Sequence, residues 1–189
     1  MAAMMINSGN KRVLLLHGET PSLFTHPEDR ATVLLFGDAG SATAIEGAKA
    51  AEPPPWYFTL RSDGHGYSDL IINSGGFRNR FGDDPREHYV TMNGANIFNF
   101  TIKRTPSLIK DTLALSEKTV DDIDYFVFHQ SNRFIMKHLA KKCGLKAEQT
   151  PVILEEFGNT GGPSVPLTIT QSVPAEGRQA SLSLMTLGY

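Results

Sequence analysis

The chain has 189 residues, of which 40% are hydrophobic and 20% charged, with a formal net charge of −2. This near-neutral balance does not indicate a nucleic-acid partner, and no run approaches the roughly 18–20 consecutive apolar residues that span a membrane. The single cysteine, Cys143, excludes an internal disulfide framework, and together with the lack of a signal-peptide pattern it predicts a cytoplasmic protein.

The first half of the chain is predicted to contain short buried strands separated by turns. Apolar runs bounded by glycine, proline or aspartate predict strands at residues 13–16, 33–36, 57–60 and 69–72. The segment "GDAGSATAIE" predicts a glycine turn followed by a further strand, and the prolines at 53–55 mark a connection. The stretch 73–88, rich in glycine and aspartate, is predicted to be a loop.

The second half is predicted to alternate helices and strands. A helix begins near Asn93, and Thr105-Pro106 has the pattern of an N-cap followed by proline at N1, which either starts a second helix or kinks the first. The later predicted elements are strands at 125–128, 151–154 and 181–187 and helices at 132–142 and 164–173. The alternation over 94–187 predicts an α/β sheet with parallel strands.

His129 and Asn159 each follow a predicted strand and precede a predicted helix. If the two strands are neighbours in a parallel sheet, both side chains emerge at its carboxyl edge, where open α/β sheets bind ligands. A neutral imidazole N–H and a carboxamide N–H are both donors, and two converging donors stabilise an oxygen that acquires negative charge. The alternative is a strand-end histidine with satisfied hydrogen bonds and an asparagine that forms a turn beside glycines.

The helix predicted to begin at Asn132 is amphipathic. Arg133, Lys137 and Lys141 fall on one narrow arc, and an apolar arc on the opposite side includes Cys143, which we interpret as a small core residue. Like charges four residues apart cost about 0.2–0.5 kcal/mol per pair. A basic face kept despite this repulsion predicts a surface for an acidic partner, and a merely solvated face is the alternative.

Several other site classes are excluded or unsupported. The glycine-rich turn "GNTGGP" (158–163) lacks the Gly-Lys-Ser/Thr of a Walker A loop and the glycine spacing of a dinucleotide fingerprint. No G-x-S-x-G follows "LLLHG" (14–18), which argues against an α/β-hydrolase. His26, Asp29 and His65 have no ligand-like spacing with other histidines or cysteine, so no metal site is predicted.

Four motifs, in order, resemble the ketoacyl-ACP synthase III family of the thiolase-like fold. They are "TVLLFGDAGSATAIE", "YVTMNGANIFNF", "DIDYFVFHQSN" and "FGNTGGPSVPLTI". The resemblance covers nearly all of residues 8–189 and implies an α/β, thiolase-like fold with layers in the order αβαβα. Residues 1–50 would then be the end of the N-terminal half of that fold, and residues 51–189 its C-terminal half, truncated before the final strand.

The resemblance also implies a chemistry. In the family, a cysteine accepts an acyl group from acyl-CoA, and a His/Asn pair stabilises the enolate that forms when malonyl-ACP loses CO₂. His129 and Asn159 fall on the positions of that pair. The positions that line the CoA and phosphopantetheine tunnel in the family are matched here by Arg30, Phe98 and Asn132.

The basic stripe of Arg133, Lys137 and Lys141 lies where the resemblance places the docking site for the acidic acyl carrier protein. One position departs from the family pattern, because Phe134 stands where a basic residue is usual, two places after the asparagine. The nucleophilic cysteine of the family lies upstream of the segment that matches residues 8–16, and Cys143 belongs to a different motif.

The expected function is that of a 3-oxoacyl-ACP synthase III-type acyltransferase. The chain is expected to carry the decarboxylation pair without the acyl-accepting cysteine, to use acyl-CoA and malonyl-ACP as substrates, and to need no cofactor or metal. Expected partners are the acyl carrier protein and a second chain, which is a homodimer copy, a chain that supplies the N-terminal half, or both. The alternative is a catalytically inactive fragment or scaffold that binds CoA or the carrier protein.

Overall fold

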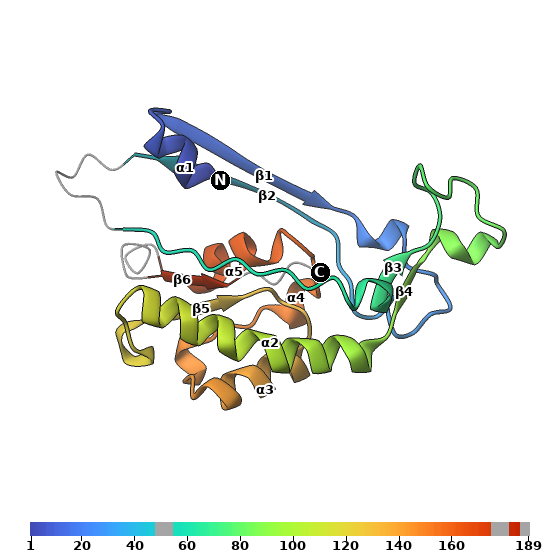
Figure 1. Cartoon of the computed structure of the whole chain (residues 1–189). Coiled ribbons are helices and arrows are strands. Elements are labelled where there is room, and N and C mark those ends of the chain that lie inside the picture. Colours follow the sequence, from blue (N-terminus) through green and yellow to red (C-terminus); the bar gives the residue numbers. More distant parts are fainter. Residues whose placement is uncertain (48–54, 175–181, 186–189) are drawn as a thin grey trace.

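The computed structural model of the chain describes residues 1–47, 55–174 and 182–185, the last of these by their backbone (Figure 1). The α-helices are α1 (Ala2–Asn7), α2 (Gly94–Leu115), α3 (Arg133–Cys143), α4 (Leu154–Phe157) and α5 (Ser164–Ser172). The strands are β1 (Arg12–Glu19), β2 (Ala39–Glu46), β3 (Leu70–Ile72), β4 (Val90–Met92), β5 (Tyr125–Phe128) and β6 (Leu182–Met185). Single 3₁₀ turns lie at Pro21–Leu23, Tyr67–Asp69, Pro85–His88, Val120–Asp122 and Ala147–Gln149.

The elements are arranged in layers. β1 and β2 form a long antiparallel hairpin, β3 and β4 form a short antiparallel pair, and β5 and β6 pair in parallel. Figure 1 shows α5 between the β1–β2 hairpin and the β5–β6 pair, and α5 contacts both β2 and β5. α2 and α3 pack against each other on the opposite face of β5 and β6. The alternation of helices and parallel strands predicted for the second half is therefore confirmed for β5, α3, α5 and β6.

The hydrophobic core lies where α2, α3 and β5 meet. Its buried residues are Ile109, Ile123, Phe126, Phe128 and Met136. The last three residues of β5 are all buried, which explains why this strand is a continuous apolar run, since a strand covered on both faces has no solvent side to alternate toward.

α2 is one continuous helix through Pro106, which settles the alternative left open by the sequence. A proline inside a helix removes the donor to the carbonyl four residues earlier, and here that carbonyl belongs to Ile102. Lys142 of α3 donates to the Ile102 carbonyl at 2.9 Å. The side chain therefore compensates for the missing hydrogen bond and joins the two helices.

Two of the predicted strands in the first half are wrong. Residues 33–36 lie in a turn because local hydrogen bonds satisfy this backbone: Val33 N–H and Thr32 N–H both donate to the Asp29 carbonyl. Phe36 alone makes a strand-like bridge, parallel to Asn159. Residues 57–60 have no ladder partner among the described residues and are not a strand.

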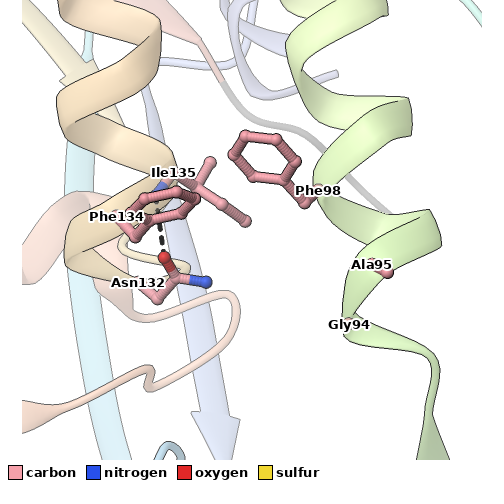
Figure 2. Close-up of a pocket in the computed structure, with 6 residues that line it drawn as sticks. All are labelled: Gly94, Ala95, Phe98, Asn132, Phe134 and Ile135. Atoms are coloured by element: carbon pink, nitrogen blue, oxygen red, sulfur yellow. Dashed lines mark hydrogen bonds between the residues drawn. The ribbon is translucent and has the colours of Figure 1, made fainter.

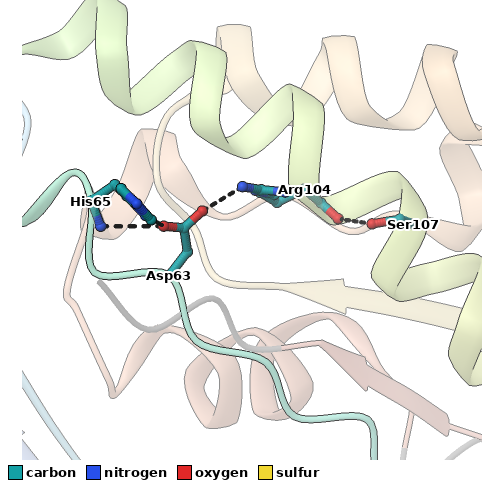
Figure 3. A network of polar contacts seen from close by, with 4 residues as sticks. All are labelled: Asp63, His65, Arg104 and Ser107. Carbon is teal, nitrogen blue, oxygen red and sulfur yellow. Dashed lines mark hydrogen bonds and ion pairs between the residues drawn. The ribbon is translucent and has the colours of Figure 1, made fainter.

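The segment around residues 57–60 is attached to α2 by charged side chains. Arg61 pairs with Asp111. Asp63 binds Arg104 and His65, as Figure 3 shows. The hydrogen bond from His65, with smaller contributions from its backbone N–H and Arg104, lowers the pKa of Asp63 to about 2. Side-chain contacts with a helix thus hold a segment that the sequence pattern predicted to be held in a sheet.

The predicted strand at 151–154 is also wrong, because a buried glutamine satisfies its backbone. Gln130 is fully buried; its Nε2 donates to the carbonyls of Phe128 and Pro151, at 3.0 and 3.4 Å, and its Oε1 accepts from Ile153 N–H at 3.1 Å. The chain then turns into the short helix α4. The strand β4 was missed, because three residues are too few to show a strand period.

We expect Gln130→Ala to lower the free energy of unfolding by about 2–4 kcal/mol, because it leaves a buried N–H and buried carbonyls without partners and opens a cavity. Urea denaturation of the full chain measures this. Gln171→Ala, at an exposed position of α5, is the matched control and should change the value by less than about 0.5 kcal/mol. Equal losses in the two variants would contradict the role assigned to Gln130.

Candidate active site

His129 lies at the carboxyl end of β5, in the turn before α3. The ring is partly buried, and its Nδ1 lies 2.8 Å from Oγ of Ser164, the first residue of α5. Ser164 is itself fully buried and its Oγ also accepts from Gln130 N–H at 3.4 Å. The imidazole is thus held where the end of a strand meets the beginning of a helix.

Asn159 lies in the glycine-rich turn between α4 and α5 and is 6% exposed. Its backbone makes a parallel bridge with the segment before β2: Asn159 N–H donates to the Leu35 carbonyl at 2.9 Å, and Gly37 N–H donates to the Asn159 carbonyl at 3.0 Å. Its side-chain Oδ1 accepts from Gly161 N–H at 3.0 Å. This bond leaves the Nδ2 amide as the group that the side chain can offer to a ligand as a donor.

The structure brings His129 and Asn159 together through Gly161. Asn159 binds the N–H of Gly161. The Gly161 backbone also acts on the His129 ring and raises its pKa, so the ring and the Asn159 side chain lie near the same residue.

The route to this arrangement differs from the one expected. The prediction relied on 125–128 and 151–154 as neighbouring strands, but residues 151–154 are not a strand. Asn159 is instead positioned by its bridge to Phe36. The convergence at the carboxyl end of β5 therefore depends on a contact between the first and last thirds of the chain.

The electrostatics of the site favour a neutral imidazole. Burial lowers the pKa of His129 below its ordinary value of 6.5, and the Gly161 backbone and the negative charge of Glu19 oppose this effect only in part. At neutral pH the ring is therefore uncharged and carries one N–H, which can serve as a hydrogen-bond donor.

A pocket of about 540 Å³ opens between α2 and α3, beside the turn that precedes α3 (Figure 2). It is lined by Gly94, Ala95, Phe98, Asn132, Phe134 and Ile135. Figure 2 shows Phe98 and Phe134 facing each other from the two helices, with ring centroids 5.1 Å apart. Oδ1 of Asn132 accepts from Ile135 N–H at 2.8 Å and so caps α3. The walls are mainly apolar, and the Asn132 amide adds a polar group.

Two of the three residues expected to bind CoA line this pocket, and the third does not. Phe98 and Asn132 are among its walls. Arg30 is exposed in the turn before Phe36 and lines neither this pocket nor a smaller polar one of about 400 Å³ near His26. The described structure does not bring Arg30 to the other two.

The basic stripe is exposed but is not uniformly unpaired. Arg133 makes an ion pair of 2.5 Å with Glu155 of α4, and both side chains are largely exposed. Such pairs contribute about 0–1 kcal/mol. Lys137 and Lys141 are exposed on α3. The acid that partners Arg133 comes from another helix, so the pattern of α3 alone did not reveal it.

Cys143 ends α3 and is partly buried against the core. Burial raises the pKa of its thiol, which opposes formation of the thiolate nucleophile.

Ser164 and Glu19 contribute to the site, although the sequence analysis did not identify them as site residues. The "SVP" motif contained a signal for Ser164, whereas Glu19 lies far away in sequence and had none.

No helix within the described ranges has the length and apolarity to cross a lipid bilayer. Among the same residues, no three His, Cys, Asp or Glu side chains cluster so as to hold a metal ion.

The sequence matches two family models. Residues 1–64 match the model described as 3-Oxoacyl-[acyl-carrier-protein (ACP)] synthase III, and residues 113–188 match the model of the C-terminal part of the same family. A Beta-ketoacyl-[acyl-carrier-protein] synthase III of Levilactobacillus brevis is 31% identical over 172 residues, which are 90% of this chain and 53% of that protein. One of Pseudoalteromonas atlantica is 33% identical over 176 residues, 92% of this chain and 53% of that protein.

Solved structures show the same likeness. A 3-oxoacyl-(acyl-carrier protein) synthase of Burkholderia xenovorans has a TM-score of 0.84 and 40% identity, covering 97% of this chain and 54% of that one. A synthase III of Thermus thermophilus has a TM-score of 0.85 and 27% identity, covering 99% and 59%. The expected α/β, thiolase-like fold is confirmed. The chain spans about half the length of the relatives it matches.

The lowered pKa of His129 predicts a pH dependence of stability. Between the folded-state pKa and the unfolded value near 6.5, the unfolded chain binds a proton that the folded chain does not, so the free energy of unfolding should fall as the pH decreases below 6.5. Urea denaturation at pH values from about 7.5 to about 5.5 measures the slope. His129→Gln should reduce it, and an unchanged slope in that variant would contradict the assignment.

Proposed function

This chain belongs to the 3-oxoacyl-[acyl-carrier-protein] synthase III family, and from that premise we propose that it carries the His/Asn half of a decarboxylating acyltransferase site. The observation that supports the proposal is that both residues lie near Gly161: the Asn159 side chain binds its N–H, and its backbone raises the pKa of His129. The proposed substrates are malonyl-ACP and an acyl thioester derived from acyl-CoA. No cofactor is proposed.

The proposed reaction begins with a malonyl thioester. Loss of CO₂ breaks the bond between the carboxylate carbon and the α-carbon, and the electron pair remains in an enolate whose charge lies on the thioester oxygen. His129 and Asn159 donate hydrogen bonds to that oxygen as its charge develops. The α-carbon then attacks the carbonyl of the acyl thioester, a carbon–carbon bond forms and the thiolate that held the acyl group leaves.

A neutral histidine suits this step better than a charged one. An imidazolium would bind the malonyl carboxylate strongly in the ground state, which would hold the group that must leave. Donors that strengthen only as the enolate forms lower the barrier, because only differential binding of the transition state raises the rate. The lowered pKa of His129 supports this reading. The Ser164 hydroxyl, donating to Nδ1, would keep the ring proton on Nε2, from which the ring would donate to the enolate.

The pocket beside α3 is proposed to hold the phosphopantetheine arm. Phe98 and Phe134 offer apolar walls, and the Asn132 Nδ2 can hydrogen-bond to an amide of the arm because its Oδ1 is used by the helix cap. Lys137 and Lys141 are proposed to contact the acidic carrier protein, with a smaller part for Arg133, whose charge is already paired with Glu155.

A second chain is proposed to complete the site. Leu14 and Leu16 of β1 are 60% and 66% exposed, and apolar side chains grouped on a hairpin indicate a surface that another chain covers. The proposed partner is a second copy or a chain that supplies the acyl-accepting cysteine and the N-terminal half. The proposed compartment is the cytoplasm.

The alternative function is a catalytically inactive module that binds CoA or the carrier protein. The position of Cys143 favours this alternative. It is the only cysteine of the sequence, it packs against the core from α3, and burial raises the pKa of its thiol. Such a module would keep the pocket and the basic face without condensing substrates.

We expect His129→Ala and Asn159→Ala each to slow the decarboxylation of malonyl-ACP by about 10²–10³-fold, since each removes one donor to the enolate oxygen. Release of labelled CO₂ measures the rate. His65→Ala, at a fully exposed ring, is the control and should leave it unchanged. Wild-type rates in both site variants would refute the proposal, whereas carrier-protein binding without any decarboxylation would establish the alternative.

We expect no stable acyl adduct on Cys143 after incubation with acyl-CoA, because its thiol is partly buried and little of it is ionised at neutral pH. Intact-mass spectrometry of the full chain measures the adduct, with Cys143→Ser as the reference. A thioester adduct that is absent from this variant would mean that the chain acylates itself, contrary to the proposal.

A further inference from the structure

Glu19, the last residue of β1, reaches the turn that carries the candidate site. Its Oε1 accepts a hydrogen bond from Gly162 N–H at 2.7 Å, across 143 residues of sequence. A carboxylate that accepts from a backbone N–H makes a charge-assisted hydrogen bond, which is shorter and stronger than one between neutral groups. The contact joins the β1–β2 hairpin to the turn before α5.

The turn is packed closely against this carboxylate. A Cβ at Gly161 would lie 1.9 Å from Oε2 of Glu19, and a Cβ at Gly162 would lie 2.8 Å both from Oε1 of Glu19 and from Nδ1 of His17. Gly161 also has a φ of +64°, which favours glycine. His17 and Glu19 are two residues apart on β1 and so point to the same side of the strand. A side chain at either position would displace the ends of the Glu19 and His17 side chains, and at Gly161 it would also be strained by the positive φ.

The same two glycines hold the site. Gly161 donates its N–H to Asn159 Oδ1, its backbone raises the pKa of His129, and Gly162 is the next residue. Adjacent glycines form the least restrained kind of backbone. The carbonyl of Gly161 accepts from Ser164 N–H at 3.1 Å, whereas the acceptor for Gly162 N–H comes from outside the turn, from Glu19.

We propose that Glu19 is a positioning residue for the His129–Asn159 pair: its carboxylate holds the Gly161–Gly162 turn in the conformation that keeps both side chains on Gly161. The proposal deepens the proposed function, because the pair it positions is the one assigned to enolate stabilisation. Its test is a property of the folded chain, so it stands or falls separately from the decarboxylation measurement.

The charge of Glu19 has a second effect on the pair. The ionisable groups that face the turn are Glu19 and His17 from β1 and His129 from the end of β5. Asp38, before β2, is bonded to Ser22, away from the turn. The negative charge of Glu19 raises the pKa of His129, in opposition to burial. Removing that charge should therefore lower the pKa of His129 further.

Two substitutions separate the hydrogen bond from the charge. Glu19→Gln removes the charge and keeps a side-chain oxygen that can accept from Gly162, whereas Glu19→Ala removes both. Glu46→Gln is the matched control, because Glu46 lies at the far end of the same hairpin and its exposed side chain pairs with Arg12 at 3.4 Å.

The experiment is NMR spectroscopy of the full chain with three readouts. They are the pH titration of the His129 ring, assigned with His129→Gln, the exchange rate of the Gly162 amide and the shifts of the Asn159 side-chain NH₂. In Glu19→Gln we expect a lower His129 pKa with the Gly162 amide still protected. In Glu19→Ala we expect the lower pKa, amide exchange faster by about tenfold or more, and a changed Asn159 signal. Glu46→Gln should match the wild type in all three.

Unchanged His129 and Asn159 signals in Glu19→Ala would overturn the proposal, even if the Gly162 amide exchanged faster, because the contact would then be structural only. If Glu19→Ala does not fold, Glu19→Leu, which also lacks the acceptor but fills more of the space, takes its place and is judged by the same His129 and Asn159 signals. If these shifts occur and the wild-type chain decarboxylates nothing, the proposed function fails and the positioning role remains.

Discussion

The candidate site depends on the peptide groups of Gly161 and Gly162. Side chains from separate parts of the chain meet there: Asn159 binds the N–H of Gly161, Glu19 binds the N–H of Gly162, and the Gly161 backbone acts on the pKa of His129. Apart from the isolated bridge between Phe36 and Asn159, the described residues form no strand pairing at this turn. The arrangement is therefore kept by hydrogen bonds to a backbone whose positive φ at Gly161 favours glycine.

The second constraint is the neutrality of the histidine. A partly buried ring beside a serine hydroxyl is a donor or acceptor according to its tautomer, and burial keeps it uncharged at neutral pH. The negative charge of Glu19 opposes that effect. Burial of the ring and the nearby negative charge of Glu19 have opposite effects on the pKa of His129. Their balance determines how close to neutral pH the ring becomes protonated.

Buried polar side chains, rather than apolar ones, connect the site to the core. Gln130, next to His129, binds the backbone of Phe128, Pro151 and Ile153 and replaces the strand pairing expected there. Lys142 likewise donates a hydrogen bond to the Ile102 carbonyl of α2, which lacks its helical donor because of Pro106. In both places a side chain from a distant part of the sequence satisfies the backbone, which is why local periodicity assigned the wrong element or left two possibilities open.

The sequence by itself determined the elements whose signals are local: the hairpin strands, the apolar β5, and α3 with its Asn132 cap and Gly144 stop. It also identified His129 and Asn159, because residue types at the ends of elements are visible in one dimension. Only the tertiary structure decided how they meet, since the Phe36–Asn159 bridge, the pairing of Arg133 with Glu155 and the reach of Glu19 to Gly162 join distant segments. Contacts of this kind depend on which backbone groups still lack hydrogen-bond partners once the chain has folded. The periodicity of the sequence does not predict them.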